Sequence, residues 1–164
     1  MDDAPAVYAY ARDPDVSRFV SWDTHRSIDD SVLFLRGIQD RDERGISHDW
    51  CVEHSGTAIG SIGLFNLEPM HERAEVGYVL GQPHWRKGLG REALELVLEH
   101  AFCTLALRRV VANVRPENTA SQRLLMAAGF RQEGLWRQHL YVKGEWWDMV
   151  AFGMLVGEFR PRSR

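Results

Sequence analysis

The stretch Trp85-Arg86-Lys87-Gly88-Leu89-Gly90-Arg91 decides the fold of this 164-residue chain, because the hydrophobic pattern differs on its two sides. Residues 73–80 have the two-residue period of a strand, with one face formed by Val76, Tyr78 and Leu80 and the other by Glu75, Gly77 and Val79. Apolar residues after the stretch recur at helical spacing over residues 88–105. The pattern therefore predicts a glycine loop between the end of a strand and the start of a helix.

A loop in this position is suited to binding an anion, because free backbone N–H groups and the positive end of the helix dipole meet there. Gly88 and Gly90 would let a diphosphate approach the main chain, and Arg86, Lys87 and Arg91 add positive charge. The alternative is a tight glycine turn with solvated basic neighbours, which an isolated G-x-G favours. No Walker motif is present, and the dinucleotide fingerprint needs three glycines after the first strand of a βαβ unit.

The rest of the chain alternates between helical and strand periods without repeats or linkers, which predicts a single domain over residues 1–164. The expected elements are helices at 2–11 and 27–38, strands at 48–54, 58–66 and 109–114, a helix at 118–128, and strands at 130–142 and 145–155. A helical crossover joins strands 73–80 and 109–114, so we expect them to run parallel. The buried stripe expected on helix 88–105 comprises Leu89, Ala93, Leu96, Val97 and Ala101.

Composition excludes several classes of function. The formal net charge of -3 offers no basic field for nucleic acid, and no apolar run reaches the roughly 18 residues of a membrane-spanning helix. Cys51 and Cys103 have no partner at metal-ligand spacing, so we expect buried free thiols, no metal and a cytoplasmic location.

Three blocks of sequence carry a resemblance to a known family. The first is Ala-Glu-Val-Gly-Tyr-Val-Leu at 74–80 together with the glycine loop and the helix start at 85–94. The second is Asn-Thr-Ala-Ser-Gln-Arg-Leu at 118–124 with Ala-Gly-Phe at 128–130, and the third is Gly-Glu-Trp-Trp-Asp at 144–148. Across residues 47–155 the chain resembles the GNAT superfamily, in particular its ribosomal-protein N-terminal (alanine/serine) acetyltransferases.

The resemblance implies an α/β (α+β) GNAT fold, in which helices flank a mixed, mostly antiparallel and twisted sheet that is splayed between strands 73–80 and 109–114. Two departures stand out. Trp85 takes the first position of a loop usually written Q/R-x-x-G-x-G/A, which puts a side-chain contact to the cofactor in doubt. The family also has a strand before its first helix, and we expect that first strand to be missing here.

The family's site residues can be placed on this sequence one by one. The resemblance implies that acetyl-CoA lies in the splayed opening with its pyrophosphate on Trp85–Arg91, and that a backbone N–H at Val79 to Leu80 binds the thioester carbonyl. Asn118 matches the residue that binds the pantetheine region. Ser121 matches the hydroxyl proposed to protonate the leaving thiolate, with Tyr141 as its rival. Helix capping is the alternative role for Asn118 and Ser121.

The attacking amine must be neutral, which favours an α-amine of pKa about 7.7 to 8.0 over a lysine side chain near 10.4. Glu75 is the leading candidate for the general base, with a salt-bridged strand carboxylate as its alternative role. Asp148 and a water molecule are the other candidates, although Asp148 would equally anchor the final hairpin. His71 and His139 are expected on the surface.

These residues predict an acetyl-CoA-dependent N-acetyltransferase in which a primary amine, from a protein N-terminus or a small molecule, attacks the thioester directly. The alternatives are a non-catalytic CoA-binding regulatory or interaction module and, more weakly, a nucleotide-binding protein. We expect acetyl-CoA and an amine acceptor as partners, no nucleic acid and no membrane, and leave a homodimer open. Acceptor identity would lie in loops 19–27, 67–72 and 136–148. We expect core packing for most of Trp22, Trp136, Trp146 and Trp147, and solvated positions for Asp23, Glu68 and Glu72.

Overall fold

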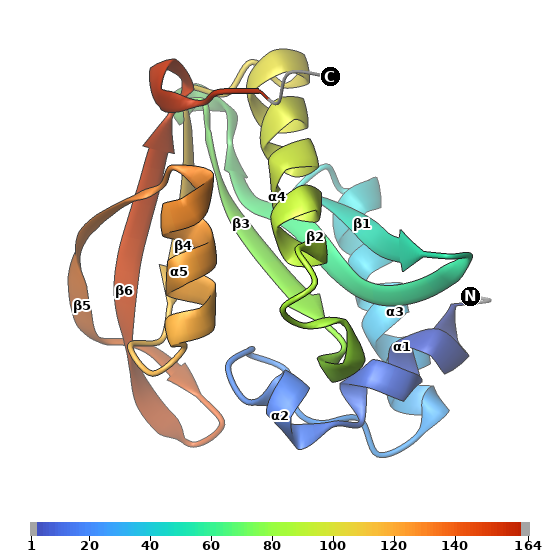
Figure 1. The fold of residues 1–164 in the computed structure, drawn as a ribbon. Coiled ribbons are helices and arrows are strands. Elements are labelled where there is room, and N and C mark those ends of the chain that lie inside the picture. The colour runs from blue at the N-terminus through green and yellow to red at the C-terminus, as the bar shows by residue number, and fades with distance from the viewer. Residues whose placement is uncertain (1–2, 162–164) are drawn as a thin grey trace.

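The computed structural model describes residues 3–161 and contains one six-stranded sheet with the order β1-β2-β3-β4-β6-β5 (Figure 1). Its strands are β1 (Ser47–His54), β2 (Thr57–Glu68), β3 (Arg73–Leu80), β4 (Arg109–Val114), β5 (Arg131–Val142) and β6 (Glu145–Leu155). Neighbouring strands are antiparallel except β3 and β4, which are parallel. The mixed, mostly antiparallel sheet and its parallel crossover are therefore confirmed.

The sheet is splayed between β3 and β4. Their pairing consists of Arg73 with Arg109, Ala74 with Val110 and Glu75 with Val111, and it ends there although β3 continues to Leu80. In Figure 1 the two ribbons diverge toward the lower edge of the molecule. The second half of β3 is consequently paired on one side only, to β2.

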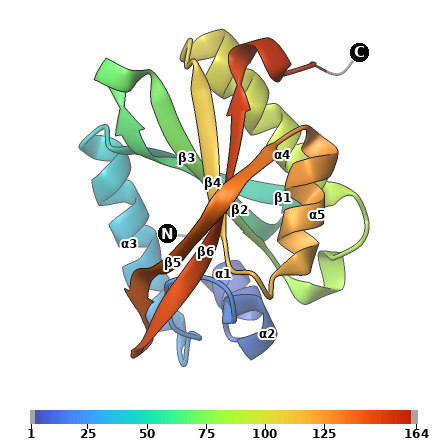
Figure 2. The ribbon, with the colours of Figure 1, turned by 90° about the vertical axis from the view of Figure 1, so that its left-hand side faces the viewer.

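Helices cover both faces of the sheet (Figure 2). They are α1 (Ala4–Ala11), α2 (Pro14–Ser17), α3 (Ile28–Glu43), α4 (Leu89–Glu99) and α5 (Thr119–Ala128). Ser27 caps α3 in a capping box with Asp30, and α2 was not predicted. Residue 2 of the helix expected at 2–11 lies outside the described residues, and within residues 3–161 no strand precedes α1.

Two apolar clusters sandwich the sheet. The larger one packs β-strand residues such as Val76 against Leu94 and Leu98 of α4 and Leu125 of α5. The smaller one packs Val79 against α1 and α2. Successive residues of β3 therefore point to opposite clusters, which holds this strand on both faces and fixes the position of the loop that follows it.

The predicted stripe on α4 is partly wrong. Leu96 is exposed, Leu89 and Ala93 are only half-buried, and the fully covered side chains on α4 are Leu94, Val97 and Leu98. The α-helix also ends at Glu99 and continues as a π-helical turn from His100 to Thr104, closed by a bond from the Leu105 N–H to the His100 carbonyl of 3.0 Å.

The two cysteines are free, as predicted, but the prediction that they are buried is wrong, since both residues are exposed. Cys51 lies on β1, an edge strand of the sheet, and Cys103 lies in the π-helical turn. Within residues 3–161, no helix has both the length and the apolar character that a membrane span requires.

Candidate active site

The glycine loop lies between β3 and α4, as predicted. Gly88 is the N-cap of α4 with a φ of 83°, and the first intrahelical bonds are donated by the N–H groups of Arg91 and Glu92 to the Gly88 carbonyl. The N–H groups before Arg91 are left without an intrahelical acceptor at the positive end of the helix. A Cβ added to Gly90 would lie 3.1 Å from both Leu124 Cδ1 and Leu80 Cδ1, so little room exists there for a side chain.

Trp85 ties this loop to the end of β3. Its indole Nε1–H donates a hydrogen bond of 2.7 Å to the Leu80 carbonyl. The Gly81 N–H donates to Ile59 on β2, and because backbone N–H groups alternate sides along a strand, the Leu80 N–H points away from β2 toward the splayed side. The Leu80 carbonyl thus already has a hydrogen-bond partner, whereas the Leu80 N–H faces the opening between β3 and β4 where the two strands no longer pair.

The basic residues of the loop differ in their surroundings. Arg86 and Lys87 are exposed, and Arg86 has a positive φ of 60°. Arg91 is paired with Glu95 on the next turn of α4, with 2.7 Å between Nε and Oε1. Arg86 and Lys87 therefore provide the more accessible positive charge at this end of the helix.

Asn118 and Ser121 lie at the start of α5, across from β3. The Asn118 side chain caps α5 by accepting a hydrogen bond of 3.1 Å from the Ser121 N–H, which establishes the capping role considered from the sequence. The Ser121 hydroxyl lies 2.8 Å from the hydroxyl of Tyr78 on β3. Burial raises the pKa of Tyr78 to about 12. The sequence reasoning did not single out Tyr78, although its place on the same face of β3 as Leu80 was foreseen.

Glu75 lies on β3 at the last pair before the splay, and two amides hold its carboxylate. Asn113 Nδ2 of β4 donates to Oε1 at 2.9 Å, and Asn66 Nδ2 of β2 donates to Oε2 at 3.1 Å. Asn113 Oδ1 is buried and has no hydrogen-bond partner among the described residues. The sequence reasoning missed both asparagines, because only the register of three strands brings them to Glu75.

The two other candidates from the sequence lie on the β5–β6 hairpin. Tyr141 is exposed and its ring packs against that of Trp146 at a centroid distance of 5.2 Å. Asp148 Oδ1 accepts a hydrogen bond of 2.7 Å from the backbone N–H of Gln138, at the point where β5 departs from regular pairing. Asp148 thus anchors the hairpin, which was the second role considered for it.

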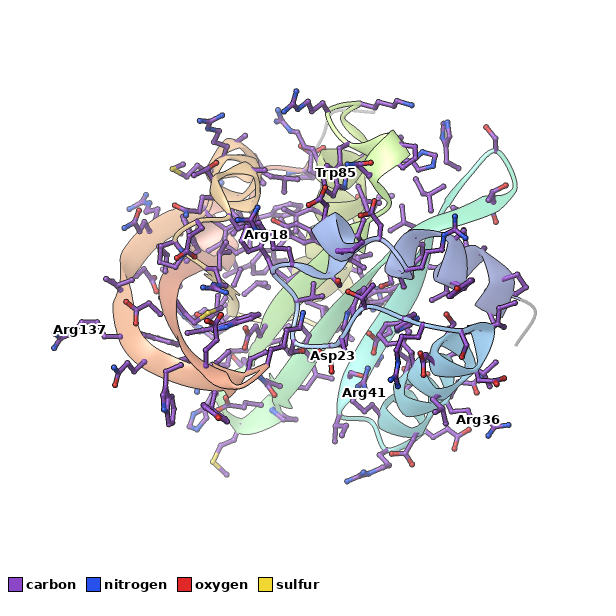
Figure 3. All side chains as sticks on the ribbon, turned by 90° about the horizontal axis from the view of Figure 1, so that it is seen from below. Arg18, Asp23, Arg36, Arg41, Trp85 and Arg137 are labelled. Atoms are coloured by element: carbon purple, nitrogen blue, oxygen red, sulfur yellow. The ribbon has the colours of Figure 1, made fainter. Side chains whose placement is uncertain are left out.

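The tip of this hairpin is joined to the end of α2. Lys143 Nζ donates a hydrogen bond of 2.7 Å to the Ser17 carbonyl, and the Ser17 and Thr24 hydroxyls lie 2.6 Å apart. Figure 3 views the molecule from this end: Arg18, Asp23 and Trp85 come from segments around it, while Arg137 points outward from β5. Two of the three loops to which the sequence assigns acceptor identity, 19–27 and 136–148, lie at this end, whereas loop 67–72 leads into Arg73 at the opposite end of β3.

A cavity of about 530 Å³ adjoins one of these segments, lined by Trp22, Asp23, Thr24, His25, Arg26, Asp30, Leu33 and Phe34. Burial lowers the pKa of His25, whose Nδ1 lies 2.8 Å from the Ser31 hydroxyl. None of the residues lining this cavity comes from β3, α5 or the glycine loop, so the cavity is separate from the splayed region.

The remaining predictions for side chains are partly confirmed. Trp147 is in the core and Trp22 packs against the smaller cluster, but Trp136 and Trp146 are exposed, so the expectation of core packing fails for them. His71 and His139 are on the surface, as expected. Asp23 and Glu72 are exposed; Glu68 is half-buried and pairs with Arg73, whose hydrogen bond lowers the pKa of Glu68. Within residues 3–161, no group of three or more His, Cys, Asp or Glu side chains is arranged to hold a metal ion.

Comparison with known proteins adds to this geometry. Residues 1–131 match the model of the acetyltransferase (GNAT) domain. The uncharacterized N-acetyltransferase YoaA of Bacillus subtilis (strain 168) is 33% identical over 165 residues, covering 98% of this chain and 90% of YoaA. The ribosomal-protein-serine acetyltransferase of Escherichia coli (strain K12) is 25% identical, covering 82% of this chain and 71% of that protein. The solved structure of Mycobacterium smegmatis RimJ in complex with CoA-disulfide is 26% identical, with a TM-score of 0.89 over 99% of this chain and 81% of RimJ.

Proposed function

The chain belongs to the GNAT acetyltransferase family and is an acetyltransferase, and we propose that it transfers the acetyl group of acetyl-CoA directly to a primary amine, with a protein N-terminus as the preferred acceptor. The observation that carries this proposal is the free second half of β3. Beyond Glu75 this half of β3 has no pairing to β4, which supports the Leu80 N–H as a donor available to the thioester.

The donor half of the site has the chemistry that acetyl-CoA requires. The amides at the start of α4, with Arg86 and Lys87, suit a diphosphate, and the positive φ of Gly88 suits a main chain that approaches its ligand. Gly90 is required for packing, because a Cβ there would lie 3.1 Å from side-chain atoms of Leu80 and Leu124. Asn118 uses its Oδ1 to cap α5, so its amide Nδ2 is the group that we assign to the pantetheine arm. In this proposal Trp85 fixes the end of β3, because its indole N–H donates a hydrogen bond to the Leu80 carbonyl.

The Leu80 N–H is the group that we assign to the thioester oxygen. As the amine nitrogen bonds to the carbonyl carbon, negative charge grows on that oxygen, and a donor already fixed in a strand stabilises the charge without reorganisation. The C–S bond then breaks, the sulfur takes a proton from the Ser121 hydroxyl, and the amine gives up its extra proton to a base. The proton on Ser121 is replaced from solvent, so the products are an amide and free CoA thiol.

Glu75 is the base that we propose, acting through water. Leu80 lies five positions after Glu75 on the strand, which at about 3.3 Å per position is roughly 16 Å, too far for a carboxylate to reach an amine attacking at Leu80. Amides of Asn66 and Asn113 occupy one site on each carboxylate oxygen, and the further lone pairs remain for a water chain. An α-amine, roughly a tenth of which is neutral at pH 7, needs no stronger assistance.

The acceptor preference rests on this amine chemistry and on the similarity to a ribosomal-protein-serine acetyltransferase. Incubation of the protein with acetyl-CoA and a panel of N-terminal peptides, polyamines and aminoglycosides tests it, with release of free thiol and mass increase of the acceptor as readouts. We expect peptides with a free α-amine to be acetylated and the same peptides with a blocked N-terminus to be inert. Binding of CoA without transfer to any member of the panel would contradict the proposal and favour a CoA-binding module.

A further inference from the structure

The hydroxyl of Tyr78 on β3 meets the hydroxyl of Ser121 on α5, 43 positions later in the chain, at an oxygen-to-oxygen distance of 2.8 Å. This is the usual length of an O–H to O hydrogen bond. A second acceptor near the phenol is the Ser121 carbonyl at 3.5 Å, which exceeds the normal range for such a bond. The backbone of Ser121 is also part of α5, where its carbonyl is in line for the N–H four residues later.

The direction of this hydrogen bond follows from the needs of the phenol. Tyr78 is half-buried, and its hydroxyl loses much of the hydration that could otherwise accept its proton. A hydroxyl in this position gains most by donating to the nearest acceptor, so the Tyr78 proton should lie on the 2.8 Å bond. Tyr78 is then the donor and Ser121 Oγ the acceptor. The proton of the serine hydroxyl is left over, because a hydroxyl has one proton and two lone pairs.

We infer that Tyr78 is a positioning residue for the acetyl transfer: its phenol donates to Ser121 Oγ and thereby turns the serine proton toward the departing sulfur of CoA. This inference rests on the proposed function, and on Ser121 as the group that protonates the thiolate. It adds no proton carrier to the reaction, since the proton that reaches sulfur is the serine's own and the phenol keeps its proton throughout. Tyr78 thus acts only through Ser121.

Two further observations agree with this role. The raised pKa of Tyr78, about 12 because of burial, keeps the phenol protonated and donating over the whole range in which an α-amine reacts. The Ser121 backbone is fixed as well, because its N–H donates to Asn118 Oδ1. Asn118 holds the main chain of Ser121 and Tyr78 holds its hydroxyl oxygen, so only the direction of the serine O–H bond remains to be set.

A double-mutant cycle tests the inference. The four proteins are the wild type, Tyr78→Phe, Ser121→Ala and the double variant, which together isolate the contact between the two hydroxyls. For each we would measure kcat, KM for acetyl-CoA with one peptide acceptor, and the Kd of CoA by calorimetry. Loss of one hydrogen bond predicts a fall in kcat of roughly 5- to 10-fold in Tyr78→Phe, with the Kd of CoA within about twofold of wild type.

The decisive comparison is the Ser121→Ala background, where the second substitution should change kcat by less than about twofold because the group through which Tyr78 acts is gone. An equal loss in both backgrounds would overturn the inference, as would a rise in the Kd of CoA that matches the fall in kcat. If Ser121→Ala turns over too slowly to measure, the split between kcat and Kd in Tyr78→Phe decides alone. A wild-type protein that releases no CoA would defeat the proposed function itself, and this inference with it.

Discussion

Replacing Gly88 with alanine should weaken CoA binding without changing the fold. Gly88 begins α4 with a φ of 83°, and a Cβ there would meet no atom within 4 Å. The only cost of Gly88→Ala is therefore the backbone conformation, which for a residue with a Cβ is roughly 1–2 kcal/mol. The free loop is exposed and can relax to a negative φ, whereas a loop that holds a diphosphate with its amides cannot.

The magnitude of the effect follows from where this cost appears. If the free loop relaxes fully, CoA binding must restore the positive φ, and the binding free energy becomes less favourable by the full cost of roughly 1–2 kcal/mol. The Kd of CoA then rises about 5- to 30-fold, since 1.4 kcal/mol is a factor of ten. If the free loop keeps its positive φ, the same cost lowers the free energy of unfolding. The loss of CoA-binding free energy from calorimetry and the loss of unfolding free energy from thermal unfolding of the free protein should therefore add up to this conformational cost.

Gly45→Ala is the matched control for this prediction. Gly45 has a φ of 66° and lies between α3 and β1, and a Cβ added there would also meet no atom within 4 Å. The same cost should appear there in unfolding alone, with the Kd of CoA unchanged. A Gly88→Ala protein that binds CoA and unfolds like the wild type would refute the assignment of this loop as the diphosphate site.

Other substitutions separate the parts of the site. Glu75→Gln should lower kcat by about 10²-fold or more, with the Kd of CoA unchanged; unaltered turnover would remove Glu75 as the base. Asp148→Asn should weaken the acceptor of the Gln138 N–H and lower the free energy of unfolding by about 1 kcal/mol in denaturant titrations, with CoA binding intact; a rate loss without this destabilisation would instead make Asp148 catalytic. The N–H of Arg26, and then that of Ser27, lower the pKa of Asp30, so its stabilisation is full above the unfolded-state pKa and lost as the pH falls through the lower folded-state value. The melting temperatures of Asp30→Asn and wild type should accordingly differ at pH 7 and converge in strong acid, and a gap that persists in acid would contradict this account.

The order of elements could be predicted from local patterns because each boundary has its own signal. Ser27 caps α3, Gly129 ends α5 with a φ of 101°, and Lys143 and Gly144 form the hairpin turn with positive φ values. The parallel pairing of β3 with β4 follows from the helical crossover between them. These features depend on residues that are neighbours in the chain.

Burial was harder to predict because it depends on what packs against each element. Leucines occur at positions 89, 94, 96 and 98 of α4, so the sequence allows more than one apolar stripe, and the sheet selects the one with Leu94 and Leu98. Cys51 is apolar enough for a core but lies on the edge strand β1. The π-helical turn after Glu99 has no signal in the sequence that we can identify.

The residues of the site also fall into those that local sequence identifies and those that only the packing of the fold brings together. Glu75, the glycine loop and Ser121 are recognisable because they lie in short blocks with fixed spacing. Their partners are not: Tyr78 reaches Ser121, and Asn113 reaches Glu75 from β4, only through the packing of α5 and the register of the sheet. Which side chains hold the reacting groups is therefore a property of the fold, whereas the identity of those groups is a property of local sequence.

The most direct test of the account is a crystal structure of the protein with CoA and an N-terminal peptide. We predict a diphosphate on the amides at the start of α4, a sulfur within hydrogen-bond distance of Ser121 Oγ, and a peptide α-amine beside the free N–H of Leu80. A CoA molecule bound elsewhere, or one whose sulfur lies on the far side of β3 from Ser121, would contradict it.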